Sequence, residues 1–324
     1  MTEVFSRMGL AEEMARLEQY LRGLVTSPLV LLARPAVYLL TAGGKRLRAL
    51  LTFLAARVQG SAIPEAAIYG AAAVELIHAA SLVHDDLIDQ SPHRRGRPTI
   101  HEKWHHDAAL LTGDYLFALA ARAISRTGDI RLLDYIGEAA VAICEGEMSS
   151  VQQAEPLEEA LAQYTFKVAR KTAVLFEAAG RVGAHCGGAG EETIAALGRF
   201  GFALGMSFQI LDDVLDYTGD ERELGKPAGG DLRRGLITLP LIYAVAYDDA
   251  DGFLHRLVER LGDDLPPEEL EEALQRVRSS SGPERARQEA GRYHREALFH
   301  LQGIADPVRS HLEEIARLAV ERSR

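Results

Sequence analysis

The most constraining feature of this sequence is the spacing of its apolar residues, which recur every three or four positions along almost the whole chain. Two long examples are AAIYGAAAVELIHAASLVHDDLID at residues 66–89 and EETIAALGRFGFALGMSFQILDDVLDYTGD at residues 191–220. Ala and Leu are prominent in these stretches, and the two-residue alternation of a half-buried strand is nearly absent. The spacing therefore predicts an all-α chain.

The interruptions of this pattern are short, and only Ser91–Pro98 and Gly219–Gly230 are long and polar enough to suggest functional loops. A length of 324 residues would allow two domains. No Pro- or Gly-rich linker divides the chain. We therefore expect residues 1–324 to form one domain, a single large helical bundle, with the Gly-rich loop as a candidate lid.

Charge and cysteine content limit the classes of function. The chain has 36 Lys and Arg against 47 Asp and Glu, a net charge of −11, which argues against a general nucleic-acid-binding protein. Cys144 and Cys186 are too few for a disulfide framework, so we expect small buried side chains in a reducing cytoplasm.

Targeting signals are not evident in the sequence. The N-terminal residues include Glu3, Glu12 and Glu13 and resemble no signal peptide. Pro, Gly or charged residues interrupt the apolar runs before they reach about 18 residues, the length that indicates a membrane span. We therefore expect no transmembrane segment.

Two aspartate clusters share the pattern D-D-x-x-D, and each follows a long apolar stretch: Asp85-Asp86-x-x-Asp89 and Asp212-Asp213-x-x-Asp216. On a helix, positions i and i+4 lie about 40° apart, so the outer carboxylates of each cluster share one face. An ordinary solvated acidic face is the alternative interpretation. Because Asp is a poor helix former and clustered carboxylates match the oxygen ligands that Mg²⁺ prefers, the clusters favour a magnesium-dependent anionic substrate.

Basic residues support an anion site. Gly43–Arg48 reads GGKRLR, a glycine turn that leads into a helix, although a solvated basic helix start would look the same. Arg94, Arg95 and Arg97 follow the first Asp cluster, and Lys226 with Arg233-Arg234 follows the second. Each cluster therefore has its own cations a few residues downstream.

With these motifs in this order, the chain resembles the trans-isoprenyl diphosphate synthases from about Gly43 to about Tyr243. The matching segments are GGKRLR (43–48), His78, HDDLID (84–89), RRGRPT (94–99), GDYLFA (113–118), Lys171-Thr172, FQILDDVLD (208–216), GKPAGGDL (225–232), Thr238 and Pro240. The resemblance implies an isoprenoid synthase helical bundle around a central cavity, which condenses isopentenyl diphosphate with an allylic diphosphate.

The resemblance also implies residue roles. Asp85, Asp86, Asp89, Asp212, Asp213 and Asp216 would hold Mg²⁺, three ions in all, on the allylic diphosphate. Arg94, Lys171 and Lys226 would contact that diphosphate. Lys45, Arg48, His78 and Arg95 would bind isopentenyl diphosphate. Thr172 and Gln209 would face the carbocation. His78 lies two helical turns before Asp85, which places both on one face.

Two positions depart from the family pattern: Ala49 stands where Pro is usual, and Leu236 where many members have Lys. Ala80 and Ser81 precede the first Asp motif, where an aromatic residue would close the product shaft, although Phe117 could cap it. The pattern thus resembles medium- and long-chain synthases, with products of about C30 or longer for quinone side chains. The Ala-rich apolar helices, together with the resemblance, predict a homodimer. We also expect peripheral membrane contact during product release.

Several alternatives stay open at this point. A short-chain synthase, making farnesyl or geranylgeranyl diphosphate, shares the motifs. A terpene cyclase shares the first Asp motif, but its second metal motif normally differs and its pocket is aromatic. A non-catalytic or heteromeric partner subunit need not keep both clusters. Finally, His101-Glu102-Lys103-Trp104-His105 is an H-E-x-x-H sequence, which on a helix could bind zinc.

Overall fold

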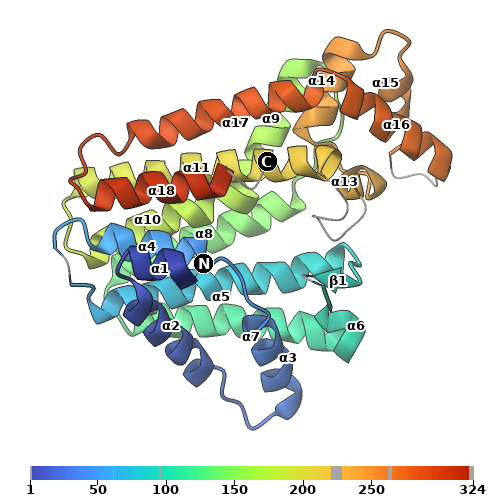
Figure 1. The fold of residues 1–324 in the computed structure, drawn as a ribbon. Coiled ribbons are helices and arrows are strands. Elements are labelled where there is room, and N and C mark those ends of the chain that lie inside the picture. Colours follow the sequence, from blue (N-terminus) through green and yellow to red (C-terminus); the bar gives the residue numbers. More distant parts are fainter. Residues whose placement is uncertain (1, 61, 95, 220–227, 262–264, 321–324) are drawn as a thin grey trace. The chain divides into compact units, whose positions relative to one another are not determined.

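The computed structural model describes residues 2–60, 62–94, 96–219, 228–261 and 265–320, and this part of the chain is helical except for one short hairpin. The helices are α1 (Thr2–Arg7), α2 (Ala11–Leu24), α3 (Val30–Leu40), α4 (Leu47–Ala56), α5 (Glu65–Ile88), α6 (Ile100–Trp104), α7 (His106–Ser125), α8 (Ile130–Met148), α9 (Leu157–Val168), the π-helical turn η1 (Ala169–Ala173), α10 (Val174–Cys186), α11 (Glu191–Thr218), α13 (Gly230–Arg233), α14 (Leu239–Asp248), α15 (Phe253–Val258), α16 (Pro267–Ser279), α17 (Gly282–Phe299) and α18 (Val308–Val320). The hairpin consists of β1 (His93–Arg94) and β2 (Arg97–Pro98), antiparallel, with His93 opposite Pro98. The all-α prediction is confirmed (Figure 1).

The chain divides into two compact units, which we describe separately. Unit 1 comprises residues 1–141, 175–201 and 300–315, and unit 2 comprises residues 142–174, 202–299 and 316–324. The first Asp motif and the GGKRLR segment belong to unit 1, and the second Asp motif belongs to unit 2. The single domain over residues 1–324 stays a prediction.

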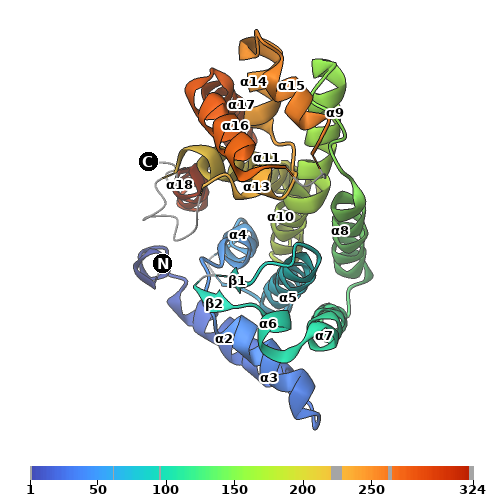
Figure 2. The same ribbon diagram turned by 90° about the vertical axis from the view of Figure 1, so that its right-hand side faces the viewer.

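Unit 1 is organised around α5, a 24-residue helix that packs along α7 and also contacts α4 and α2 (Figure 2). Small side chains allow the close packing, since Ala71, Ala72 and Ala73 are fully buried. Burial continues along the helix as far as Asp86, so the first Asp motif sits at the end of a rigid, buried helix.

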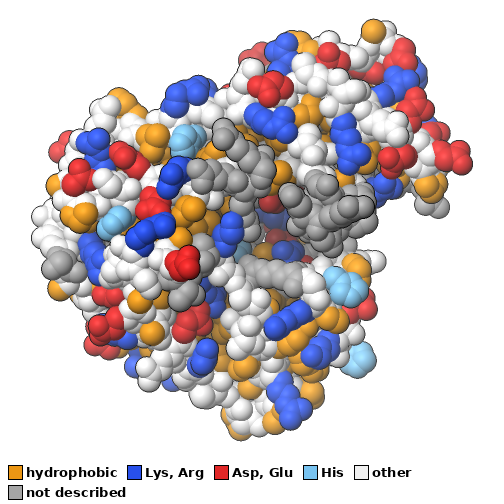
Figure 3. Space-filling view, viewed as in Figure 1, with side chains coloured by type: hydrophobic (Ala, Val, Ile, Leu, Met, Phe, Trp, Pro, Cys, Tyr) orange, Lys and Arg blue, Asp and Glu red, His pale blue; other side chains and the backbone are white. Residues whose placement is uncertain are grey.

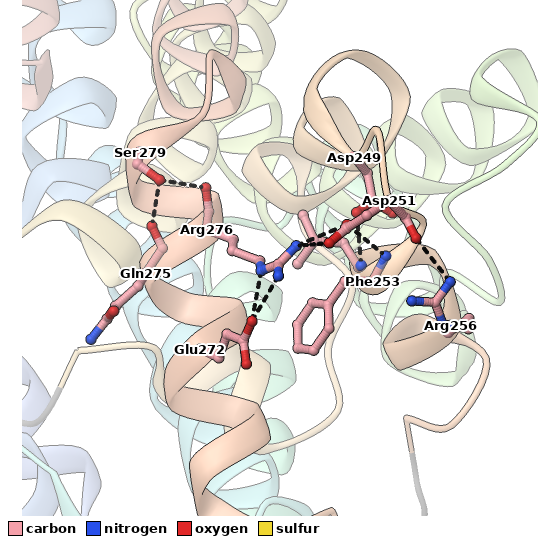
Figure 4. A network of polar contacts seen from close by, with 9 residues as sticks. Asp249, Asp251, Phe253, Arg256, Glu272, Gln275, Arg276 and Ser279 are labelled. Carbon is pink, nitrogen blue, oxygen red and sulfur yellow. Dashed lines mark hydrogen bonds and ion pairs between the residues drawn. The ribbon is translucent and has the colours of Figure 1, made fainter.

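Unit 2 has a core in which α14 packs against α17 and α9. Its large buried side chains include Tyr164, Tyr217 and Leu241. At one end, α15 and α16 are joined by polar contacts (Figure 4). The Asp249 carboxylate accepts the backbone N–H groups of Leu254 and His255 at 3.0 and 2.8 Å, which satisfies donors at the start of α15.

Arg276 completes the connection between these two helices. Its guanidinium donates to both carboxylate oxygens of Asp251 at 2.8 Å, contacts Glu272 on its own helix, and lies 4.2 Å from the Phe253 ring centroid (Figure 4). Acidic side chains gather on the surface over α15 and α16 (Figure 3). Glu268 and Glu271, both on α16, are exposed. This surface agrees with the negative net charge of the sequence.

Two sequence expectations are wrong: that no apolar stretch reaches the length of a membrane span, and that both cysteines are buried. The expected absence of a transmembrane segment stays a prediction. Three helices, Glu65–Ile88, His106–Ser125 and Glu191–Thr218, are long and apolar enough to cross a membrane by length and composition. In their most apolar stretches, 72%, 44% and 67% of the residues are buried inside the protein, so packing accounts for much of this apolar character. Cys144 is exposed and Cys186 only partly buried, and both are free thiols.

Candidate active site

In unit 1, the three carboxylates of the first Asp motif have different environments. Asp85 and Asp89 are partly exposed, with Asp89 as the residue that ends α5, whereas Asp86 is only 4% exposed. Arg94 Nε donates to Asp86 Oδ1 at 2.6 Å. Burial raises the pKa of Asp86, and the Arg94 charge opposes that rise. Asp86 is thus engaged within the protein, which leaves Asp85 and Asp89 as the accessible pair.

The segment that carries Arg94 is held by its own backbone. Ser91 N–H donates to the Asp86 carbonyl at 3.0 Å, and the buried Thr99 hydroxyl donates to the Ser91 carbonyl at 2.8 Å, which closes the β1–β2 hairpin. Tyr38 on α3 donates to the Pro98 carbonyl at 2.9 Å. The described residues of the RRGRPT segment, Arg94 and Gly96–Thr99, are therefore held in position by these contacts and by the β1–β2 pairing. Arg95 lies outside the described residues.

A glycine on α7 makes room for the residue before the first Asp motif. A Cβ atom at Gly113 would lie 2.1 Å from His84 Nε2. The same imidazole nitrogen lies 3.2 Å from the Leu110 carbonyl and 3.6 Å from Asp114 Oδ1. Because His84 immediately precedes Asp85, this close approach fixes the end of α5 against α7. The lack of space beside His84 explains why the GDYLFA segment has glycine at position 113.

The GGKRLR segment forms the predicted turn before a helix, but its three cations differ. Arg46 has a positive φ of 49° and is a structural residue: it pairs with Glu18 at 2.9 Å and with the buried Glu75 at 3.0 Å. Lys45 is partly buried, and the Arg48 guanidinium lies 4.2 Å from the ring centroid of the buried Phe176. His78 lies on α5, partly buried, two turns before Asp85 as expected.

In unit 2, the π-helical turn η1 carries Lys171 and Thr172. A Cβ atom at Gly146 on α8 would lie 2.5 Å from the Lys171 backbone nitrogen, so only glycine permits this contact. Lys171 forms an ion pair with Glu147, which follows Gly146 on α8. Single π-helical turns inside longer helices are frequent at functional sites. Sequence patterns predicted neither this turn nor the role of Glu147.

Thr172 begins a chain of hydrogen bonds that ends in the second Asp motif. Its hydroxyl donates to Gln209 Oε1 at 2.9 Å, and Gln209 Nε2 donates to Asp213 Oδ1 at 2.8 Å. The hydroxyl of Tyr164 on α9 donates to Asp213 Oδ2 at 2.6 Å. Burial raises the pKa of Asp213, with a further rise from the charge of Asp231, and burial also raises the pKa of Tyr164.

The remaining two carboxylates of this motif also differ in exposure. Asp212 is exposed, whereas Asp216 is 3% exposed. Asp216 Oδ2 accepts the backbone N–H of Asp231 at 2.8 Å, and its carbonyl accepts the N–H of Gly229 at 2.7 Å. Asp216 therefore holds the segment that follows the Gly-rich loop. Lys226 and most of the candidate lid, residues 220–227, lie outside the described residues.

Comparison with known proteins assigns the family. The polyprenyl synthetase family model matches residues 30–277 of this chain. This chain belongs to the polyprenyl synthetase family. The heptaprenyl diphosphate synthase component 2 of Geobacillus stearothermophilus is 39% identical over 295 residues, which cover 91% of each chain. Like its relatives, this polyprenyl synthetase is a prenyltransferase.

Solved structures agree over nearly the whole chain. The decaprenyl diphosphate synthase from Rhodobacter capsulatus is 37% identical, with a TM-score of 0.89 and 99% of each chain covered. A polyprenyl synthase from Caulobacter crescentus, complexed with calcium and isoprenyl diphosphate, is 34% identical with a TM-score of 0.91, covering 100% of this chain and 98% of the other. The expected family and fold class are therefore confirmed.

The zinc alternative loses its structural basis in this polyprenyl synthetase. An H-E-x-x-H zinc site needs both histidines on one helix. Here α6 ends at Trp104, and His105 adopts a φ of 79°, so His101 and His105 do not share a continuous helix. Among the residues that the structure describes, no three His, Cys, Asp or Glu side chains lie close enough to hold a metal ion by themselves.

Gly113→Ala is expected to lower the prenyltransferase activity of the chain by roughly ten- to a hundredfold, because the added methyl group displaces His84 and with it Asp85. The measurement is steady-state elongation, with the unfolding temperature recorded in parallel. Gly23→Ala is the matched control, since nothing lies within 4 Å of a Cβ at that position in α2. Equal activity of the two variants would contradict the assigned role of Gly113.

Proposed function

We propose that this chain is a trans-polyprenyl diphosphate synthase that condenses isopentenyl diphosphate head to tail with an allylic diphosphate. The observation that carries the proposal is the pairing of each Asp motif with cationic or polar partners inside its own unit: Asp86 with Arg94, and Asp213 with Gln209 and Thr172. The synthase names of the relatives support the same reaction. The product we propose is about C30 or longer, for quinone side chains.

The donor set fits Mg²⁺. We propose direct contact with the ions for the accessible carboxylates Asp85, Asp89 and Asp212, with three ions per site. We propose that the buried carboxylates Asp86 in unit 1 and Asp213 and Asp216 in unit 2 serve Mg²⁺ binding by holding their neighbours in place. Mg²⁺ keeps several waters and shares its shell with substrate phosphates. This preference accounts for the lack, among described residues, of a three-ligand site formed by the protein alone.

The chemistry needs a leaving group that is stabilised as its carbon–oxygen bond ionises. Bound Mg²⁺ would supply Lewis-acid stabilisation of the departing diphosphate. Arg94, Lys171 and Lys226 would bind that diphosphate, and Lys45, Arg48, His78 and Arg95 would bind isopentenyl diphosphate. Charge developing on the leaving group would then be stabilised by cations such as Arg94 and Lys171, which ion pairs with Asp86 and Glu147 hold in position.

Thr172 and Gln209 would face the allylic cation with their oxygens. The isopentenyl double bond would attack this cation, and the proton lost afterwards would go to the departing diphosphate. Water must stay out, since it would quench the cation.

Elongation with primers of different length tests the reaction and the product length together. Purified protein, Mg²⁺ and labelled isopentenyl diphosphate are incubated with allylic primers from C5 to C20, and the products are sized by chromatography. Products of C30 or longer are expected, and EDTA should abolish them. Elongation of no primer, either by the chain alone or with a partner subunit added, would contradict the proposed condensation. Products that stop at C15 or C20 would favour the short-chain alternative.

A matched pair of variants at Ser81 sharpens this test. Ala80 is fully buried and Ser81 partly buried on α5, one turn before Asp85. If the growing chain runs along this helix, Ser81→Phe should shorten the main product by at least one C5 unit. Ser81→Thr should leave the product unchanged. Unchanged products in Ser81→Phe would point to a floor elsewhere, such as Phe117 on α7.

We further propose a homodimer in the cytoplasm, with residues 1–324 as one domain and with peripheral membrane contact during product release. Apolar side chains on one face of α7 support a second copy as the partner: Leu110 and Leu111 are 43% and 56% exposed. Leu133 and Val141 on α8 are also exposed.

Leu111→Asp is expected to convert the dimer into a monomer, because a buried charge without a partner is costly at an interface. Light scattering after size-exclusion chromatography gives the mass. Phe299→Asp, which changes an exposed apolar residue on α17, should leave the mass of the dimer unchanged. A dimer that persists in Leu111→Asp would contradict the α7 interface.

A heteromeric enzyme is the second candidate, and the name "component 2" of the Geobacillus relative favours it specifically. In that case this chain would need a second, different subunit for activity. Elongation by the purified chain alone would contradict this candidate. Elongation that appears only after a partner protein from the same cell is added would support it.

A further inference from the structure

The buried phenol of Tyr164 has a place in unit 2 that none of the motifs accounts for. Tyr164 lies on α9 and is 3% exposed, and Asp213 lies 49 positions later on α11 and is 4% exposed. Their hydrogen bond is short, at 2.6 Å from the phenol oxygen to Asp213 Oδ2. A distance in this range is typical of a strong O–H···O hydrogen bond.

The geometry around Asp213 leaves neither of its oxygens without a donor. Gln209 Nε2 donates to Oδ1 at 2.8 Å, while Tyr164 donates to Oδ2. With both oxygens occupied, the carboxylate has one rotational position. The Gln209 amide is oriented in turn, because its nitrogen must face Asp213 and its oxygen must then face the Thr172 hydroxyl, 2.9 Å away.

We infer that Tyr164 is a positioning residue for the condensation: it holds Asp213, and through Asp213 it fixes both the Gln209 amide and the neighbouring metal ligand Asp212. This inference rests on the function proposed above. The described hydrogen bond of the Tyr164 hydroxyl is the one to Asp213 Oδ2. Its effect is to keep an acceptor oxygen of Gln209 directed at Thr172 and to keep the start of the second Asp motif in one conformation.

Removal of the phenol oxygen should disturb this arrangement without a large change in packing. Tyr164→Phe keeps the ring and leaves Asp213 Oδ2 buried with one donor fewer. A hydrogen bond to a charged group is worth enough to change an equilibrium about tenfold. We therefore expect kcat to fall about tenfold and the half-saturating Mg²⁺ concentration to rise. The KM for isopentenyl diphosphate should stay unchanged, because Lys45, Arg48 and His78 belong to unit 1.

Two readouts test the inference on the full-length chain. Steady-state elongation gives kcat, KM and the Mg²⁺ dependence. Titration calorimetry with Mg²⁺ and an unreactive allylic S-thiolodiphosphate gives affinity without turnover, and we expect about tenfold weaker binding in Tyr164→Phe. Tyr243→Phe is the control, since Tyr243 on α14 packs against the same core. If Tyr164→Phe does not fold, Asp213→Asn tests the same hydrogen bond from its acceptor side.

The outcomes separate this inference from the proposed function. Weaker analogue binding and a raised Mg²⁺ requirement in Tyr164→Phe, but not in Tyr243→Phe, support the positioning role. Unchanged binding and Mg²⁺ dependence in Tyr164→Phe, or equal losses in both variants, overturn it. If the unaltered chain elongates no primer, the proposed function fails, while the calorimetric comparison still decides the role of Tyr164. If the unaltered chain binds no analogue with Mg²⁺, both fail.

Discussion

Asp212→Asn is expected to reduce elongation at saturating substrates and Mg²⁺ by about a hundred- to a thousandfold, the scale observed when one preorganised electrostatic group is removed from an active site. Within the second Asp motif, Asp213 and Asp216 are buried and accept hydrogen bonds from the protein, whereas Asp212 is exposed. Asp212 therefore provides the motif's accessible negative charge. Asparagine keeps the size of the side chain and removes that charge.

The test compares the loss of elongation activity in Asp212→Asn with the change in its unfolding temperature. The unfolding temperature of Asp212→Asn should match that of the unaltered chain or exceed it, because repulsion within the Asp motif is relieved. Glu192→Gln, which removes an exposed negative charge in the first turn of the same helix α11, should retain full activity. Activity of Asp212→Asn within a factor of a few of the unaltered chain would exclude Asp212 as a metal ligand.

Glu75→Ala is expected to lower the free energy of unfolding by about 3–5 kcal/mol, the usual cost of leaving one partner of a buried ion pair alone. Glu75 is 3% exposed on α5, and its carboxylate accepts from Arg46 Nη1 at 3.0 Å and from the Ala49 N–H at 3.1 Å. Its loss leaves the Arg46 guanidinium, only 11% exposed, with Glu18 and the Leu40 carbonyl as partners.

Urea unfolding, followed by circular dichroism, measures this change. The double variant Glu75→Met with Arg46→Met removes both buried charges and should recover much of the loss, as coupled residues do in a double-mutant cycle. If the single and double variants lose the same stability, the ion pair is not the cause. Arg46→Met alone should also alter the turn that presents Lys45 and Arg48, so its KM for isopentenyl diphosphate should rise.

The fold class and the main site segments were predictable because they depend on local patterns. Helical periodicity needs only the spacing of apolar residues, and D-D-x-x-D places its carboxylates on one helical face at any position in a fold. The ends of α5 and α11 accordingly carry Asp85 and Asp212 as expected. Spacing did not predict which carboxylates are accessible, because burial depends on neighbouring helices that are distant in the sequence.

The residues that sequence reasoning missed are those with distant partners. Tyr164 meets Asp213 across 49 positions, and Arg46 meets Glu75 across 29. For Glu75 a signal existed: it is a charged residue within the apolar run AAAVELIHAA, where an unpaired charge would be too costly. Tyr164 gave no such signal, since a tyrosine in an amphipathic helix is ordinarily part of the core.

The π-helical turn at Ala169–Ala173 also limits how this chain can change in length. A turn of this kind accommodates one residue more than a regular helix would. Deletion of one residue there would restore an uninterrupted α-helical ladder, and it would rotate Lys171 and Thr172 by roughly 100° relative to Tyr164. Such a deletion would produce a more regular helix in which Lys171 and Thr172 point away from their partners. Natural and engineered variants should therefore tolerate substitutions in this turn far better than deletions.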